Sequence, residues 1–282
     1  MFSFFDFISL KLSTTSSRTT LIAEYLRLKK INRLLPKNLI INILKEPKRY
    51  CDFISFLCFL NNKKVVNLID IGANVGNFSA DFLNFFPKCK KIFLFEPLNF
   101  LNDSINKRLK KNKNLNITII NKALANKKKL GIIFFDKNKT ELSSLNKYTN
   151  EYKSSFPEKF APDEKCTIQI DKLDNACKNF SKNSNFIIKI DTQGNELEVI
   201  QGGLKTIARS SLLLIECSFA EQFKKKEQTF SKCVSLLSKI DMHPIVFQPP
   251  HGSYKLSNYA IERNVVFAKK KLLKKVYYQN YK

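Results

Sequence analysis

Short apolar runs alternate with amphipathic segments along most of the chain. The first clear run covers residues 65–71; a turn with two glycines follows it, and a helical pattern then extends over 77–86. Near-continuous Val, Ile and Leu runs of this length are typical of parallel strands that are buried on both faces. Six further runs have the same character, and we predict strands at 91–95, 117–121, 186–190, 212–215, 244–247 and 265–268.

Helical patterns separate most of these strands. We expect the helix that starts at residue 196 to end at Gly202 and Gly203, because glycine commonly closes a helix. The last two strands have no helix between them, so they should pair antiparallel. The pattern predicts an α/β domain with a mainly parallel seven-stranded sheet, an antiparallel last strand and helices on both faces. The predicted helices that follow strands are at 77–86, 98–111, 172–180, 196–201 and 224–239.

Two regions depart from this alternation. Strands are also predicted at 131–135 and 166–170, and the polar stretch between them is too long for an ordinary turn, which indicates a functional loop or lid. Residues 1–62 carry helical patterns interrupted by prolines and contain no chemical motif, so we expect a helical cap. The predicted organisation is a helical N-terminal extension, an α/β domain and a basic tail, at 1–62, 63–270 and 271–282.

Acidic residues stand at the carboxyl ends of four of the predicted strands: Asp70, Glu96, Asp191 and Glu216. In open α/β sheets, ligands bind beyond the carboxyl ends of the strands, where these side chains should meet. Glu96 stands where an acid typically binds both ribose hydroxyls of a nucleoside, because a carboxylate only accepts hydrogen bonds and the diol donates two. The alternative is that Glu96 caps the next helix and binds no ligand.

The glycine turn after residues 65–71 is a second candidate for ligand binding. Gly72 allows a sharp turn and leaves room for a ligand to lie against the backbone. The turn does not match the Gly-x-Gly-x-x-Gly fingerprint of dinucleotide sites, and the carboxylate of Asp70 would repel a pyrophosphate. It suits a cationic ligand, such as an α-amino group or a sulfonium.

Four passages together resemble one protein family, the FkbM-type methyltransferases that depend on S-adenosyl-L-methionine (SAM). The resemblance covers about residues 65–270, with weaker matches at 121–124, 143–145 and 264–267. The third passage, which begins Lys-Ile-Asp-Thr-Gln-Gly, is the most specific. The passages are Asp-Ile-Gly-Ala-Asn-Val-Gly at 70–76, Phe-Glu-Pro at 95–97, the stretch 189–202, and Ile-Glu-Cys-Ser-Phe at 215–219.

The resemblance implies a class I methyltransferase, Rossmann-like fold, SAM as the cofactor and methyl transfer, usually to a hydroxyl oxygen. Members of the family often act in polysaccharide, glycolipid or natural-product pathways. The expected acceptor is therefore a hydroxyl on a sugar, glycan, glycolipid or other small molecule. Gln193 and Asn264 stand where many members have an acid. The residues implied to bind the cofactor are Asp70, Gly72, Asn74, Gly76, Glu96, Ala123 and Asp191.

Three carboxylates are candidates for the base that takes the proton from the acceptor hydroxyl. Asp191 is the first, because it ends the central strand 186–190; Glu216 is the second and Glu196 the third. Asp191 could instead be a structural cap, and Glu196 could simply start a helix, where acid is favoured by the helix dipole. His251, on the loop 248–264, is a weaker candidate.

The charge balance leaves the class of partner open. Lys and Arg number 49 against 24 Asp and Glu, a formal net charge of +25. Such a balance points to nucleic acid, anionic lipid or anionic glycan. The lysines are scattered, however, and a compositional bias toward Lys, Asn, Ile and Phe explains the charge better. An RNA methyltransferase and a non-catalytic cofactor-binding protein therefore remain the less favoured alternatives.

Location and assembly are also only expectations. The chain has 7 Cys, 2 His and no Cys-x-x-Cys, so neither a metal site nor a disulfide framework is predicted. No apolar run reaches the ~20 residues that span a bilayer, and a cytoplasmic location is expected. The phenylalanine-rich residues 1–10 are not a good signal peptide and favour packing on the domain over weak peripheral membrane contact. The oligomeric state is left open.

Overall fold

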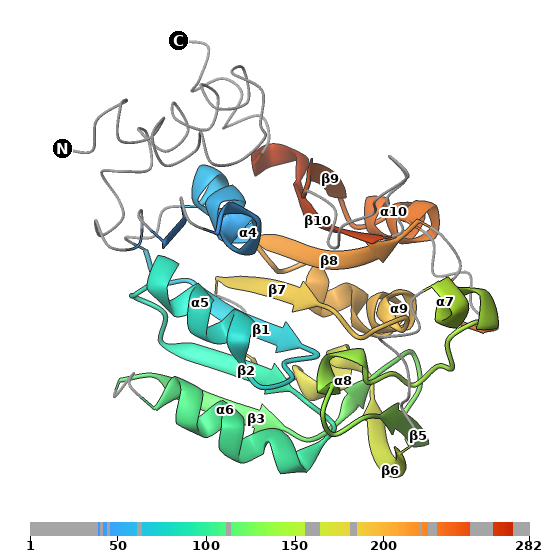
Figure 1. Ribbon diagram of the computed structural model, residues 1–282. Coiled ribbons are helices and arrows are strands. Elements are labelled where there is room, and N and C mark those ends of the chain that lie inside the picture. Colours follow the sequence, from blue (N-terminus) through green and yellow to red (C-terminus); the bar gives the residue numbers. More distant parts are fainter. Residues whose placement is uncertain are drawn as a thin grey trace, which may run out of the picture.

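A twisted seven-stranded sheet forms the centre of the computed structural model (Figure 1). The strand order is β3-β2-β1-β7-β8-β10-β9, and β10 is antiparallel to both neighbours while the pairs among β3, β2, β1, β7 and β8 are parallel. This arrangement confirms the predicted class I methyltransferase fold. The strands are β1 (Asn67–Ile71), β2 (Lys91–Phe95), β3 (Asn116–Ile120), β7 (Phe186–Ile190), β8 (Leu212–Ser218), β9 (Met242–Phe247) and β10 (Glu262–Lys269).

The structure describes residues 39, 42–43, 46–60, 64–110, 114–155, 164–180, 185–219, 222–224, 230–248 and 262–272. The predictions made for the first 38 residues, for His251 and for the tail after residue 272 lie outside this part of the chain.

Helices cover both faces of the sheet and bury two separate apolar layers. Along β8, Leu212 and Leu214 face one layer, and Leu213 and Ile215 face the other. Burial on both faces explains why the strands appear in the sequence as near-continuous apolar runs. One layer is covered by α4 (Pro47–Phe59), α5 (Asn77–Phe85) and α6 (Asn102–Leu109), and the other by α8 (Leu173–Ala176), α9 (Glu196–Ile207) and α10 (Phe230–Ser238).

Helix α4 falls within the predicted N-terminal extension, yet its aromatic face is part of the core of the sheet domain. Tyr50, Phe53 and Phe56 are buried in the same layer as β1, and the Phe53 ring stacks on Phe85 of α5 with centroids 4.9 Å apart. Among the helices of the described residues, none has the length and apolar character needed to cross a bilayer.

A second, three-stranded sheet interrupts the alternation, with the order β4-β6-β5. The two extra strands predicted there are present, and they pair antiparallel as β5 (Lys129–Phe135) and β6 (Glu164–Asp171). The short β4 (Ala123–Leu124) was not expected. The described part of the long stretch after β5 contains two short helices, η2 (Thr140–Leu142) and α7 (Asn150–Ser155), separated by turns and isolated bridges at Ser144 and Tyr148. A further short helix, η1 (Asn99–Leu101), precedes α6.

Several predicted element ends are wrong: α8 is shorter than the predicted helix 172–180, α10 begins later than residue 224, and β9 and β10 are longer than the predicted strands. Two further differences have a clear physical reason. Helix α9 does not stop at Gly202 and Gly203 but continues to Ile207, because these glycines serve close packing: a Cβ on Gly202 would lie 2.1 Å from the carbonyl oxygen of Ala125. Glu216 lies inside β8 rather than after its end, since β8 pairs with β10 as far as Ser218.

Candidate active site

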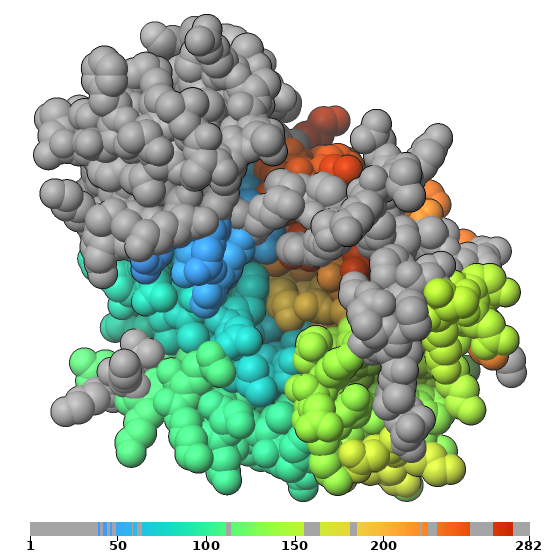
Figure 2. All heavy atoms as spheres, viewed as in Figure 1, coloured from blue at the N-terminus to red at the C-terminus, as the bar shows by residue number. Residues whose placement is uncertain are grey.

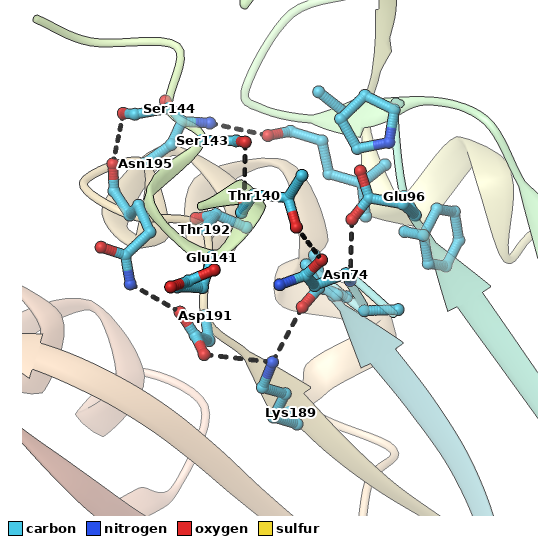
Figure 3. A pocket seen from close by; sticks show the side chains of 18 of the residues that line it. Asn74, Glu96, Thr140, Glu141, Ser143, Ser144, Lys189, Asp191, Thr192 and Asn195 are labelled. Carbon is cyan, nitrogen blue, oxygen red and sulfur yellow. Dashed lines mark hydrogen bonds and ion pairs between the residues drawn. The ribbon is translucent and has the colours of Figure 1, made fainter. Parts of the chain in front are cut away.

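A cavity of about 250 Å³ opens at the carboxyl ends of the strands (Figure 3). It lies where the chain order of the strands diverges, with β2 on one side of β1 and β7 on the other, which is the usual place for a ligand in an open α/β sheet. Its wall combines the turns after β1, β2 and β7, the residues around β4, the loop 140–145 and Asn264 of β10.

The turn after β1 is shaped by left-handed backbone. Gly72 has a φ of 78° and Asn74 a φ of 48°, and the Gly72 N–H donates to the carbonyl oxygen of Phe95, 3.0 Å away. A Cβ on Gly72 would lie 1.7 Å from the carbonyl oxygen of Asp191. Glycine is therefore required here both by its φ and by the close approach of the turn after β7.

Glu96 is a buried carboxylate on the cavity wall, next to that turn. Its Oε2 accepts the N–H of Asn74 at 2.8 Å, and its Oε1 accepts the N–H of Leu98 at 3.0 Å. Burial raises the pKa of Glu96 to about 7, although the two backbone donors act to lower it. Each oxygen still has a lone pair for a further donor, so supporting the backbone and binding a diol are compatible roles.

Lys189 is the buried cation of the site and joins two carboxylates. Its Nζ donates to the Gly72 carbonyl oxygen at 2.9 Å and lies 3.2 Å from Asp191 Oδ2 and 3.5 Å from Asp70 Oδ1. Burial acts to lower the pKa of Lys189, but the charges of Asp191 and Asp70 outweigh it and hold the pKa above its usual value.

Asp70 is completely buried behind the cavity wall. Ser79 Oγ donates to its Oδ2 at 2.7 Å, and burial raises the pKa of Asp70 against the lowering effects of Lys189 and Ser79. We expected Asp70 to face a cationic ligand; the cation that it faces in the structure is Lys189. Its role is to hold that lysine beneath the turn.

Gln193 bridges two acids, Asp191 and Glu216, whose pKa values are shifted in opposite directions. The Gln193 Nε2 donates to Asp191 Oδ1 at 3.0 Å and to Glu216 Oε2 at 2.7 Å. For Asp191, the effect of burial is outweighed by Lys189 and Gln193, and its pKa is lowered; for Glu216, burial and then the charge of Asp191 raise the pKa well above its usual value. The opposite pKa shifts make Asp191 the member of the pair that ionises more readily and Glu216 the member that holds its proton more strongly.

Glu196 stabilises the turn between β7 and α9. Its carboxylate accepts the Thr192 N–H at 2.8 Å, the Thr192 hydroxyl at 3.0 Å and the Gly194 N–H at 3.0 Å. Burial raises its pKa to about 7. These contacts match the structural alternative, in which Glu196 starts the helix.

The loop after β5 is fastened to the same turn. Tyr148 donates its hydroxyl to Gln193 Oε1 at 3.2 Å, Ser144 Oγ donates to the Gln193 carbonyl oxygen, and Asn146 Nδ2 donates to the Gly194 carbonyl oxygen at 2.6 Å. Figure 2 shows this loop, in yellow-green, beside the cyan segments that follow β1. The part of the predicted lid that the structure describes is therefore docked on the site.

The structure brings five of the nine predicted site residues to the cavity wall and keeps four outside it. Two further residues are central to the site. The sequence indicated Lys189 only as an ion-pair partner and Gln193 only as a difference from relatives. Gln193 has a φ of 52°, which nothing in the sequence indicates. On the wall are Gly72, Asn74, Glu96, Ala123 and Asp191, and outside it are Asp70, Gly76, Glu196 and Glu216.

Comparison with known proteins agrees with this geometry. Residues 70–243, more than half of the chain, match the family described as "Methyltransferase FkbM domain". The chain belongs to the FkbM methyltransferase family. This membership and the seven-stranded fold support a SAM-dependent methyltransferase. No curated protein matches this FkbM chain.

Solved structures similar to this FkbM protein include other methyltransferases at low identity. An rRNA methylase from Streptococcus thermophilus has 12% identity and a TM-score of 0.40, with 79% of this chain and 96% of that chain covered. A precorrin-6y C5,15-methyltransferase from Geobacter metallireducens has 13% identity and a TM-score of 0.37, with 77% of this chain and 88% of that chain covered. A putative methyltransferase from Streptococcus mutans in complex with SAH has 11% identity and a TM-score of 0.40, with 76% of this chain and 96% of that chain covered.

The cofactor that the family implies fits the residues present. A nucleoside needs a hydrogen-bond acceptor for its ribose hydroxyls, and the buried Glu96 carboxylate on the wall supplies one. The expected room for a ligand beside Gly72 is taken up by the Asp191 carbonyl oxygen, but Gly72 and Asn74 still line the cavity, so the turn can contact the cofactor.

Proposed function

We propose that this FkbM protein transfers a methyl group from SAM to a hydroxyl oxygen of a sugar, glycan, glycolipid or other small molecule. The observation that carries the proposal is the placement of two different carboxylates on either side of β1. Glu96 follows β2 and Asp191 follows β7, and both line one cavity. One side suits a nucleoside and the other an acceptor hydroxyl.

Glu96, the turn at Gly72 and Asn74, and Ala123 would hold the cofactor. When bound, it supplies a methyl group that its sulfonium makes electrophilic. The chain then has to align an acceptor oxygen with that group, and alignment alone can supply several kcal/mol of the barrier.

Asp191 is the proposed base. Its pKa is lowered, about a third of its side chain is exposed, and it lines the cavity, whereas the pKa of the neighbouring Glu216 is raised and Glu216 is not on the wall. Its lowered pKa makes it a weak base. A weak base is sufficient, because the hydroxyl proton becomes strongly acidic as the oxygen gains a methyl group. Lys189 and Gln193 fix both oxygens of Asp191 in place.

Nucleic acid is the less favoured acceptor. The cavity wall carries three carboxylates, Glu96, Glu141 and Asp191, and two lysines. Each lysine is already paired with an acid, Lys189 with Asp191 and Lys122 with Asp171. A phosphate group would therefore meet the carboxylates, which repel it, and no unpaired lysine among the described residues of the wall.

Calorimetry with SAM and with S-adenosylhomocysteine tests the first half of the proposal. The parent protein should bind both. Glu96→Ala removes a hydrogen bond to a charged group worth about 1.5–3 kcal/mol, so binding should weaken by roughly 10- to 150-fold. Asp103→Ala, an acid in the first turn of α6, is the matched control and should bind as the parent does. No measurable binding by the parent protein would refute SAM use.

A further inference from the structure

A buried carboxylate from helix α4 lies behind the acceptor side of the site. Asp52 is 6% exposed, its Oδ2 accepts the Asn264 Nδ2–H at 3.0 Å, and its Oδ1 has no hydrogen-bond partner among the described residues. Both Asp52 and Asn264 lie outside the stretch 70–243 that matches the FkbM family. The matched stretch thus covers neither residue, although Asn264 stands where many members of the family have an acid.

Asn264 connects this carboxylate to the cavity. It lies on the cavity wall and pairs directly with Glu216 across β10 and β8. Side chains directly opposite one another in an antiparallel pair lie on the same face of a sheet. Asn264 and Glu216 thus share a face with Leu214, which belongs to the layer covered by α4. The acceptor side of the cavity is bordered by β10 and backed by α4.

The carboxylate at position 52 is unfavourable for stability. Burial raises its pKa to about 7, while the Asn264 amide and the more distant charge of Lys189 act to lower it and the charge of Asp191 raises it. The other polar groups nearby, Ser55 and Gln248, are neutral and hydrogen-bond to each other. An asparagine at position 52 would have nearly the same shape and no charge, so stability does not explain an acid with one unsatisfied oxygen.

We propose that Asp52 is a positioning residue of the acceptor site, and that through Asn264 it selects an uncharged acceptor with two neighbouring hydroxyl groups. The proposal rests on the proposed function. An ionised Asp52 accepts the Asn264 amide N–H, so the amide oxygen is the part of Asn264 that is left to accept a hydroxyl proton. Asp191 accepts a second hydroxyl. Two acceptors on one wall match the two donors of a sugar diol.

This arrangement predicts a pH-dependent acceptor site. A protonated Asp52 can donate its own hydrogen bond, which favours the reversed orientation of the Asn264 amide, with its oxygen toward α4. Acceptor binding should therefore be tighter when Asp52 is ionised, above about pH 7. Glu96 and Glu196 have pKa values in the same range, so only the difference between parent and variant isolates Asp52.

The test measures binding of neutral methyl glycosides (gluco, manno, galacto and rhamno) by ligand-observed NMR, with S-adenosylhomocysteine present, at pH 6.0 and 8.0. The parent should bind at least one glycoside several-fold more tightly at pH 8.0. Asp52→Asn should lose this difference, and Asn264→Ala should weaken binding at both pH values. Ser55→Ala, a neighbour on α4 that contacts Gln248, is the control and should keep the difference.

Calorimetry separates this proposal from the proposed function. All variants should bind S-adenosylhomocysteine within two-fold of the parent, and thermal unfolding should show Asp52→Asn to be folded and at least as stable as the parent at pH 8.0. If the cofactor product binds but Asp52→Asn keeps the full pH dependence, or no glycoside binds, the role of Asp52 is refuted. If S-adenosylhomocysteine itself does not bind, the proposed function fails and this proposal fails with it.

Discussion

Replacing the buried Lys189 by methionine tests the electrostatic organisation of the site. The change removes a cation that contacts Asp70, Asp191 and the Gly72 carbonyl oxygen, while it keeps a side chain of similar length. Removing one partner of a buried ion pair costs about 3–5 kcal/mol, because the other charge remains buried. We expect the free energy of unfolding at pH 8 to fall by that amount.

The cost should come mainly from Asp70. Asp191 is 33% exposed and water can solvate it, whereas Asp70 is 0% exposed and hydrogen-bonds only one hydroxyl, that of Ser79, among the described residues. The double variant Asp70→Asn, Lys189→Met should therefore recover at least about 2 kcal/mol of the loss. Lys107→Met, on the exposed side of α6, is the matched control and should change stability by less than about 0.5 kcal/mol.

The sign of the pH dependence follows from the direction of the pKa shift. Burial already raises the pKa of Asp70, and losing Lys189 raises it further. A carboxyl group whose pKa is raised on folding favours the folded state at low pH and loses that contribution as pH rises. Urea unfolding should thus show a smaller deficit for Lys189→Met at pH 5 than at pH 8. A deficit below about 1 kcal/mol at pH 8, or one equal at both pH values, would contradict this reasoning.

Two further predictions concern the turns on either side of the cavity. Gly72→Ala should destabilise the protein by more than about 3 kcal/mol, because the new Cβ would lie 1.7 Å from the Asp191 carbonyl oxygen and the residue has a positive φ. Gly131→Ala is the control and should cost about 1 kcal/mol, because its Cβ would meet only the flexible end of Ile170. Equal losses of stability in thermal unfolding would refute the close-approach argument. Glu196 has a folded-state pKa of about 7 against 4.5 when free, so its contribution is present at low pH and is lost as pH rises through 7. Relative to Glu196→Gln, the parent should lose about 3 kcal/mol of unfolding free energy between pH 4.5 and 7.5, and parallel stability curves would show that the group is not perturbed.

The sheet could be predicted from the sequence because its signals are local. The runs 91–95 and 186–190 match the bounds of β2 and β7, since a strand buried on both faces must be apolar throughout. Gly202 and Gly203 were wrongly predicted to end α9, because the packing contacts that require them are not a local signal. The residue type alone cannot distinguish a glycine needed for close packing from one that ends a helix. The close neighbours that distinguish them, Ala125 at Gly202 and Leu173 at Gly203, are known only from the structure.

The site was predictable only in part. Glu96 and Asp191 could be placed on the wall because each directly follows a strand, and strand ends meet at one edge of the sheet. The sequence could not decide whether Glu196 is a base or a structural residue, because its contacts to the 192–194 turn depend on three-dimensional placement. Asp52 carried no signal at all, since its partner Asn264 is 212 residues away in the chain.

The fastening of the loop after β5 to Gln193 has a consequence for protein engineering. A natural way to change acceptor preference is to exchange the loop 136–155 for that of a relative. Here the exchange would remove the Tyr148 and Ser144 hydrogen bonds to Gln193, whose amide also bridges Asp191 and Glu216. The loop and the 191–194 turn should therefore be exchanged together, and grafts that carry the 191–194 segment with the loop should retain turnover where grafts of the loop alone lose it.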